Sequence, residues 1–141
     1  MRGFKYFLDT NVFLRPIVRD VPSQAADCLK LLEKISKGGL VAFTSSLVLA
    51  ELNWTLLKFY DYSKSDIVEI LSGLAVAKNL KIADRYNPVQ ASQLYTTYNV
   101  KFIDCLIASH PQISSQQMAV VSYDKDFDKL GVKRFEPSDL I

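Results

Sequence analysis

The chain of 141 residues is poor in cysteine and histidine, with two cysteines and one histidine. Cys28 and Cys105 stand in apolar, helix-like surroundings, and no zinc-binding spacing is present. They provide no disulfide framework, so we expect two core thiols and a cytoplasmic location. His110 precedes Pro111 at an expected helix end, where we predict a capping or surface role. Around this single histidine the sequence offers no Ser-His-Asp catalytic set to build.

Long apolar runs, glycine-rich loops and strong charge are missing as well. No apolar segment approaches the roughly 20 residues of a membrane span, and Lys5 and Asp9 interrupt the apolar start. We therefore expect no signal peptide and no membrane association. The five glycines form no phosphate-binding loop. The formal net charge of +2 lacks the strongly basic footprint of a dedicated DNA-binding domain, although it permits a nucleic-acid partner.

What is present is an ordinary globular composition in which strands and helices alternate. The length suits one domain, which we place over residues 1–141. Apolar alternation and helical spacing predict an α/β fold with a mostly parallel sheet. Strands are expected at 4–8, 40–44, 79–84 (the weakest), 118–124 and, at an edge, 132–137. Helices are expected at 22–37, from Ser45 or Ser46 towards Tyr60, at 62–75, from Asn87–Pro88 onward, at 100–110 and at 125–131.

Two acids stand in helices that are otherwise almost entirely apolar. Glu51 is the one acid in "SSLVLAELNWTLLKFY", a helix we expect to be buried on most sides, and Asp104 is the one acid in "VKFIDCLIAS". A buried carboxylate costs several kcal/mol unless it is paired or bound to a metal. The structural alternatives are a narrow exposed stripe for Glu51 and a helix N-cap for Asp104.

Further acids follow two of the expected strands. Asp9 follows the first, in "FLDTNVFLR". Asp124 falls at the end of the strand expected at 118–124, and Asp126 and Asp128 follow it. Ligand sites in parallel sheets form beyond the carboxyl ends of strands. The alternatives are an Asx-turn that leads into a helix at Asp9, and a capped turn with solvated acids for the others.

Four distant regions thus each contribute one acid at a strand end or on an apolar helix. If these carboxylates cluster, they repel one another and raise each other's pKa, and a divalent cation removes that penalty. Oxygen ligands without histidine or cysteine suit Mg²⁺ or Mn²⁺. The pattern predicts a metal-dependent phosphodiesterase centre.

The motifs "FLDTNVFLR", "SSLVLAELNW", "FIDCLIAS" and "VVSYDKDF" occur in an order and spacing that resemble the PIN-domain family of ribonucleases, and within it the VapC-like toxins of toxin–antitoxin pairs. The resemblance spans nearly the whole chain. It implies a three-layer α/β/α fold, dependence on Mg²⁺ or Mn²⁺, endonucleolytic cleavage of RNA, homodimerisation and inhibition by a small antitoxin.

On this resemblance the catalytic, metal-binding set maps to four acids, which are Asp9, Glu51, Asp104 and Asp124. Asp126 is the alternative to the fourth, and Asp124 ranks first because it is expected to end the strand. We expect Asp9 and Asp104 to be the principal metal ligands and Asp124 to be a further ligand. Glu51 is expected to bind a second metal or to orient the attacking water. Asp128 is expected in solvent.

Smaller expectations concern residues near these acids. Thr10 or Asn11 is expected either to bond an acid or phosphate oxygen or to order the turn. Ser45 or Ser46 is expected to cap a helix, and Arg15 to lie in solvent or contact RNA near the entrance.

Two rival functions stay open at this point. One is a PIN-fold scaffold that binds RNA or protein without cleavage. The other, an aspartate-nucleophile phosphatase, is disfavoured because it needs a second Asp where Asn11 stands.

Overall fold

The computed structural model describes residues 4–141, and within that range five short strands form one parallel sheet. The order is β3-β2-β1-β4-β5, and every pairing is parallel. The predicted sheet is confirmed, including the weak strand and the edge strand. The strands are β1 (Lys5–Leu8), β2 (Val41–Thr44), β3 (Leu80–Ile82), β4 (Met118–Val121) and β5 (Arg134–Phe135).

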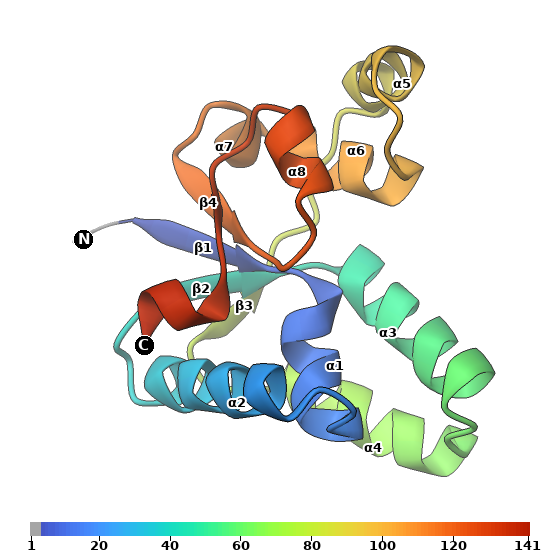
Figure 1. The fold of residues 1–141 in the computed structure, drawn as a ribbon, viewed down its shortest axis with the longest axis vertical. Helices are drawn as coiled ribbons and strands as arrows, with labels where there is room; N and C mark the ends of the chain where they lie inside the picture. The colour runs from blue at the N-terminus through green and yellow to red at the C-terminus, as the bar shows by residue number, and fades with distance from the viewer. Residues whose placement is uncertain (1–3) are drawn as a thin grey trace.

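Helices cover both faces of the sheet, which confirms the predicted three-layer α/β/α fold (Figure 1). One face carries α1 (Thr10–Val18), α2 (Pro22–Ser36), α3 (Ser46–Phe59) and α4 (Lys64–Ala75). The other face carries α5 (Pro88–Thr97), α6 (Phe102–Ala108), α7 (Pro111–Ser114) and α8 (Asp126–Lys129). A final 3₁₀ turn, η1 (Pro137–Leu140), packs against α2. Among residues 4–141, no helix combines the length and apolar character needed to cross a membrane.

Local sequence sets most of the helix boundaries. Ser45 caps α3, as predicted, and Ser63 caps α4, each by accepting a hydrogen bond from a backbone N–H. Pro88 lies at the start of α5. The single helix predicted over 100–110 is wrong at its end, because α6 stops at Ala108 and His110 caps a separate helix, α7.

The central strands β1 and β4 form the core. Phe7, Leu8, Val120 and Val121 are completely buried, since helices cover the sheet on both sides. Each such side chain stabilises the fold by about 1.5–3 kcal/mol relative to exposure. The two strands therefore form a rigid base at whose carboxyl ends other groups can be positioned.

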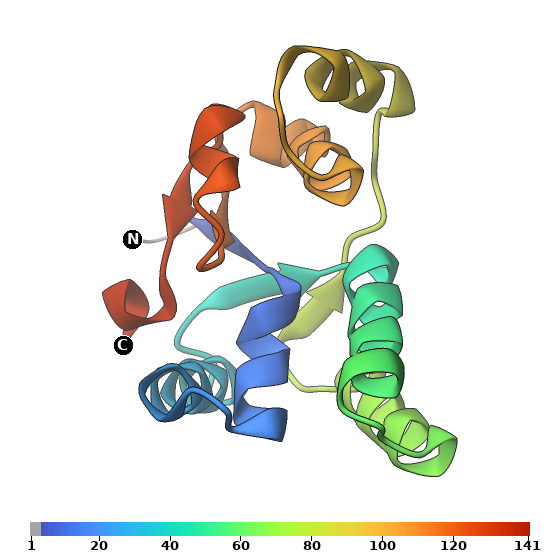
Figure 2. The same cartoon turned by 45° about the vertical axis from the view of Figure 1, so that its right-hand side comes forward.

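Helix α3 is less buried than its sequence suggests. Val48, Leu52 and Leu56, at four-residue spacing, are fully buried, whereas Trp54 and Phe59 are more than half exposed. The expectation that this helix is buried on most sides is therefore wrong. A single stripe of α3 is buried because the helix packs against α1 and α4 at the rim of the fold (Figure 2).

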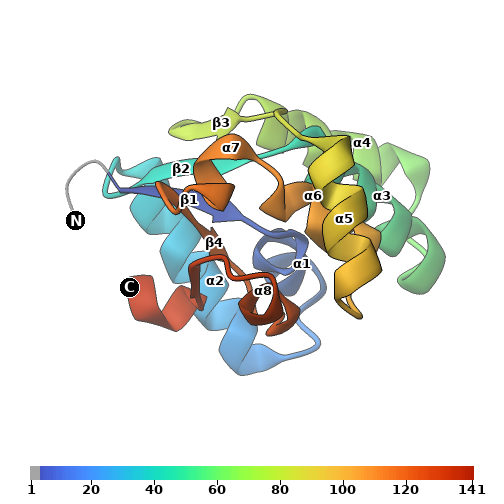
Figure 3. The ribbon, with the colours of Figure 1, turned by 90° about the horizontal axis from the view of Figure 1, so that it is seen from above.

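The carboxyl ends of β1 and β4 lie at the point where the connections change direction. From β1 the chain crosses one face to reach β2, and from β4 it crosses the other face to reach β5 (Figure 3). Such a switch point leaves room for a ligand site in a parallel sheet. The two ends are tied together, because the backbone N–H of Asp9 donates a 3.0 Å hydrogen bond to the carbonyl of Val121.

Candidate active site

Asp9 follows β1 directly and is the N-cap of α1. Its Oδ1 accepts a 2.8 Å hydrogen bond from the N–H of Thr10, and its Oδ2 accepts a 2.7 Å bond from Ser122 Oγ. Burial raises the pKa of this carboxyl group, while the two hydrogen bonds act in the opposite direction. The alternative that Asp9 leads into a helix is confirmed. Each carboxylate oxygen accepts one hydrogen bond and keeps a further lone pair for a ligand.

Ser122 joins the ends of the two central strands. It is completely buried one residue after β4. While its hydroxyl donates to Asp9, it accepts a 3.0 Å hydrogen bond from the N–H of Asp124. One hydroxyl group can do both, because it has one proton and two lone pairs. We did not predict this residue; its signal in the sequence is a small polar side chain between a buried strand and an acid.

Glu51 lies half-buried on α3, between the buried and exposed sides of the helix. Its Oε1 accepts a hydrogen bond from Thr10 Oγ1, which links the starts of α1 and α3. The prediction that Thr10 or Asn11 bonds an acid is thus confirmed for Thr10.

Asp104 is the most deeply buried of the acids away from the strand ends. It lies in the first turn of α6 and is 2% exposed, and the N-cap is Lys101, so the N-cap alternative for Asp104 is wrong. Its Oδ2 is buried without a hydrogen-bond partner among residues 4–141. Burial, followed by the nearby negative charge of Asp9, raises the pKa of Asp104 to about 8.

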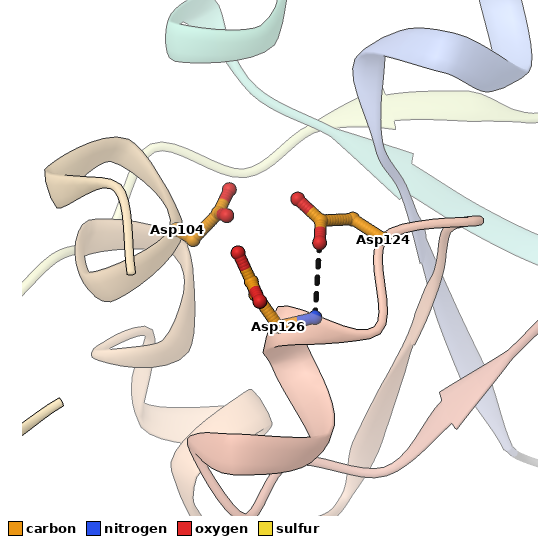
Figure 4. A group of neighbouring side chains, drawn as sticks. All are labelled: Asp104, Asp124 and Asp126. Carbon is orange, nitrogen blue, oxygen red and sulfur yellow. Dashed lines mark hydrogen bonds between the residues drawn. The ribbon is translucent and has the colours of Figure 1, made fainter. Parts of the chain in front are cut away.

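Asp124, in the turn before α8, and Asp126, the first residue of α8, point towards Asp104 (Figure 4). One carboxylate oxygen from each of the three lies within 4.8 Å of the others. The prediction that Asp124 directly ends the strand is wrong, because β4 stops three residues earlier, at Val121. Its position instead depends on Ser122 and on a 2.9 Å bond from the N–H of Asp126 to its Oδ1.

A small cavity of about 160 Å³ brings most of these groups together. Neither Asp104 nor Asp126 is among the residues that line it, and the carboxylate of Asp126 forms an ion pair with Lys129 at 3.2 Å. Lys101 and Thr55, to which we assigned no role from the sequence, do contribute to the wall. The lining residues are Asp9, Thr10, Asn11, Glu51, Thr55, Lys101 and Asp124.

The donor set fits a hard divalent cation. Within the described residues the cluster offers carboxylate oxygens and no histidine or cysteine, which suits Mg²⁺ or Mn²⁺. The unpartnered Oδ2 of Asp104 is a candidate ligand atom, because its burial costs free energy until a cation or donor meets it. A bound cation also offsets the mutual repulsion of the acids.

Several other candidate residues lie away from the cavity. Arg15 forms an ion pair of 2.8 Å with Asp20. Ser46 donates two hydrogen bonds to Asp84 at the start of α3.

His110 is buried and caps α7 through Nδ1, so its predicted capping role is confirmed and a surface role is excluded. Both cysteines are buried in the core, as expected, and are Cys28 and Cys105. Asp128 is exposed and paired with Arg134.

An acidic corner at the switch point of a five-stranded parallel α/β/α fold defines the class of this protein. The sequence profile of the PIN domain matches residues 6–133. The chain therefore belongs to the PIN-domain family, as its motifs predicted. The matched range begins within β1 and includes every acid of the site.

A solved structure shows the same fold. It is the crystal structure of VapBC2 from Rickettsia felis bound to a DNA fragment from their promoter, and a chain in it superposes with a TM-score of 0.67. The two chains are 21% identical, and the alignment covers 94% of this chain and 98% of that one. At this identity the likeness establishes the fold. No curated protein matches the sequence significantly.

Proposed function

We propose that this chain is a metal-dependent endoribonuclease that cleaves RNA phosphodiester bonds and serves as the toxin of a toxin–antitoxin pair. One observation carries the proposal: Asp9, Glu51 and Asp124 line one cavity next to Asp104, whose Oδ2 has no partner. Membership of the PIN-domain family supports a nuclease. A filled set of four acids disfavours the non-cleaving scaffold.

The acids divide the work by position. Asp9 and Asp104 are the principal ligands for Mg²⁺ or Mn²⁺, and Asp124 is a further ligand. When bound, the cation supplies positive charge that polarises the phosphodiester and makes water a stronger nucleophile. Glu51 Oε2 is free of the hydrogen bond that occupies Oε1, so it orients water or accepts its proton.

Neighbouring side chains hold these carboxylates in place. Ser122 fixes Asp9 and the turn that carries Asp124, and Thr10 fixes Glu51. Preorganisation of this kind matters because a misplacement of about 1 Å can reduce a rate by about a hundredfold.

Cleavage of RNA by the purified chain tests the proposal. We expect structured RNAs to be cut with Mn²⁺ or Mg²⁺ and to stay intact in EDTA. Asp9→Asn and Asp104→Asn are expected to lose at least about a hundredfold in rate, the scale of one well-placed catalytic group. Asp66→Asn, an exposed acid of α4, is the matched control. Cutting that survives both site variants contradicts this site, and RNA binding without any cutting favours the scaffold.

The toxin assignment predicts two binding surfaces, one for a small antitoxin and one for a second copy of this chain. An apolar groove of about 440 Å³ between α1, α2 and α4 suits an amphipathic segment of a small antitoxin. Exposed Trp54 and Phe59, in edge-to-face contact at 5.2 Å, suit a homodimer surface. Expression is expected to stop growth, and a small co-encoded protein is expected to relieve the arrest. Unimpaired growth with active nuclease favours a housekeeping role.

Two further parts of the proposal concern location and organisation. The buried, unpaired thiols of Cys28 and Cys105 support a cytoplasmic enzyme. One continuous sheet supports a single nuclease domain.

A further inference from the structure

Lys101 occupies a position that helix geometry does not explain. It is the N-cap of α6, and its side chain makes no capping hydrogen bond. Ser, Thr, Asp and Asn are strongly preferred at N-caps because their oxygens accept from the free N–H groups of the first turn. A lysine side chain has no acceptor, so Lys101 supports the start of the helix through its backbone carbonyl and not through its side chain.

The side chain instead reaches the acid cavity. Among its described lining residues, Lys101 is the one that carries positive charge. Its Nζ lies 3.8 Å from Asp124 Oδ2, beyond hydrogen-bond distance, and the side chain is 61% exposed. The ammonium group is therefore held at the mouth of the cavity by nearby carboxylates, while its N–H donors still face solvent.

An RNA strand must bring a phosphate towards four carboxyl groups, which repel it. An ammonium at the mouth offsets that repulsion, because lysine binds phosphate as a compact point charge. We propose that Lys101 binds a backbone phosphate of the RNA substrate at the entrance to the cavity. This inference rests on the proposed ribonuclease function and adds a substrate-binding residue to it.

A purely structural role predicts a different result. If Lys101 only balances the carboxylates, its replacement alters stability and Mg²⁺ affinity but leaves RNA affinity and its salt dependence unchanged. A phosphate contact releases counterions, so its loss makes the dependence of log Kd on log salt shallower by about 0.7 for a single strand.

The test compares four variants in binding a short fluorescein-labelled single-stranded RNA of mixed sequence. Anisotropy titrations are run in EDTA over a range of salt, and KM for cleavage is measured with Mg²⁺. Lys101→Met and Lys101→Ser remove the charge, and Ser also provides an N-cap oxygen that supports folding. Lys101→Arg keeps the charge. Lys78→Met makes the same change on an exposed residue before β3, at the opposite end of the sheet.

We expect Lys101→Met and Lys101→Ser to weaken RNA binding about tenfold at low salt, to reduce the salt slope and to raise KM. Lys101→Arg and Lys78→Met are expected to stay within about threefold of wild type. If the protein cuts RNA while Lys101→Ser keeps wild-type affinity, slope and KM, the inference falls alone. If wild type neither binds nor cuts RNA, the proposed function falls with it.

Discussion

Ser122 Oγ lies 2.7 Å from Asp9 Oδ2, so a hydroxyl group after β4 holds the carboxylate that follows β1. The contact joins residues that are 113 positions apart in the chain. It lies at the switch point of the sheet, where the backbone of Asp9 also bonds Val121. The geometry of the site therefore depends on a residue that is not itself an acid.

Replacement of Ser122 by Ala is expected to affect stability and activity together. It leaves a buried carboxylate oxygen without its donor, which costs about 1–3 kcal/mol, and it frees the turn of Asp124. We expect a lower melting temperature and at least a tenfold weaker Mg²⁺ affinity. Differential scanning calorimetry measures the melting temperature, and titration calorimetry measures the Mg²⁺ affinity. Ser72→Ala, an exposed serine on α4, is the control, and equal behaviour of the two variants contradicts the role.

Asp104 is expected to make the metal-free protein less stable as pH rises. Its pKa is raised from 3.8 to about 8 in the folded chain. Between these values the folded state binds more protons than the unfolded state, so the free energy of unfolding falls with increasing pH. At pH 8 in EDTA, Asp104→Asn should exceed wild type by at least about 1 kcal/mol, or about 3 °C. A variant less stable than wild type at pH 8 contradicts this account.

Binding of the cation is expected to release a proton from the same carboxyl group. With the pKa of Asp104 near 8, the carboxyl is largely protonated at pH 7, and a ligand carboxylate must be ionised. Mg²⁺ or Mn²⁺ should therefore displace about one proton at pH 7 and bind more tightly at pH 8. Calorimetric titrations in buffers of different ionisation enthalpy count the protons. A wild-type count near zero contradicts this account, because it means that Asp104 either does not bind the cation or is already ionised at pH 7.

Thr10→Val is expected to reduce turnover without unfolding the protein. The change removes the hydroxyl that bonds Glu51 and keeps the side-chain volume. We expect kcat for RNA cleavage to fall about tenfold, less than the roughly hundredfold loss expected when a general base is removed, because Glu51 itself remains. The change in KM is expected to be smaller. Thr10→Ser, which restores the hydroxyl, is expected to recover most of the activity. Similar losses in both variants would mean that the hydroxyl is unimportant.

Asp124→Asn and Asp126→Asn form a matched pair that decides the fourth acid. Asp124 lines the cavity with Asp9, whereas the carboxylate of Asp126 pairs with Lys129. We expect about a hundredfold loss of cleavage for Asp124→Asn and less than tenfold for Asp126→Asn. The reverse order of activities in the RNA assay would assign the site to Asp126.

Much of the fold could be predicted because its signals are local. The buried strand before Asp9, the serine caps of α3 and α4, and the proline at the start of α5 are all visible within a few residues. The exposure of Trp54 was not predictable in this way. An apolar helix has the same pattern whether neighbours cover it on one side or on several.

The sequence by itself determined the order of strands and helices and the four acids at strand ends and in apolar helices, because hydrophobic spacing and residue chemistry are properties of short segments. Only the tertiary structure decided that Ser122 bonds Asp9, that Lys101 lies at the cavity, and that the pKa of Asp104 is raised. These depend on distances between segments and on exclusion of water, which exist only once the sheet has brought the ends of β1 and β4 together.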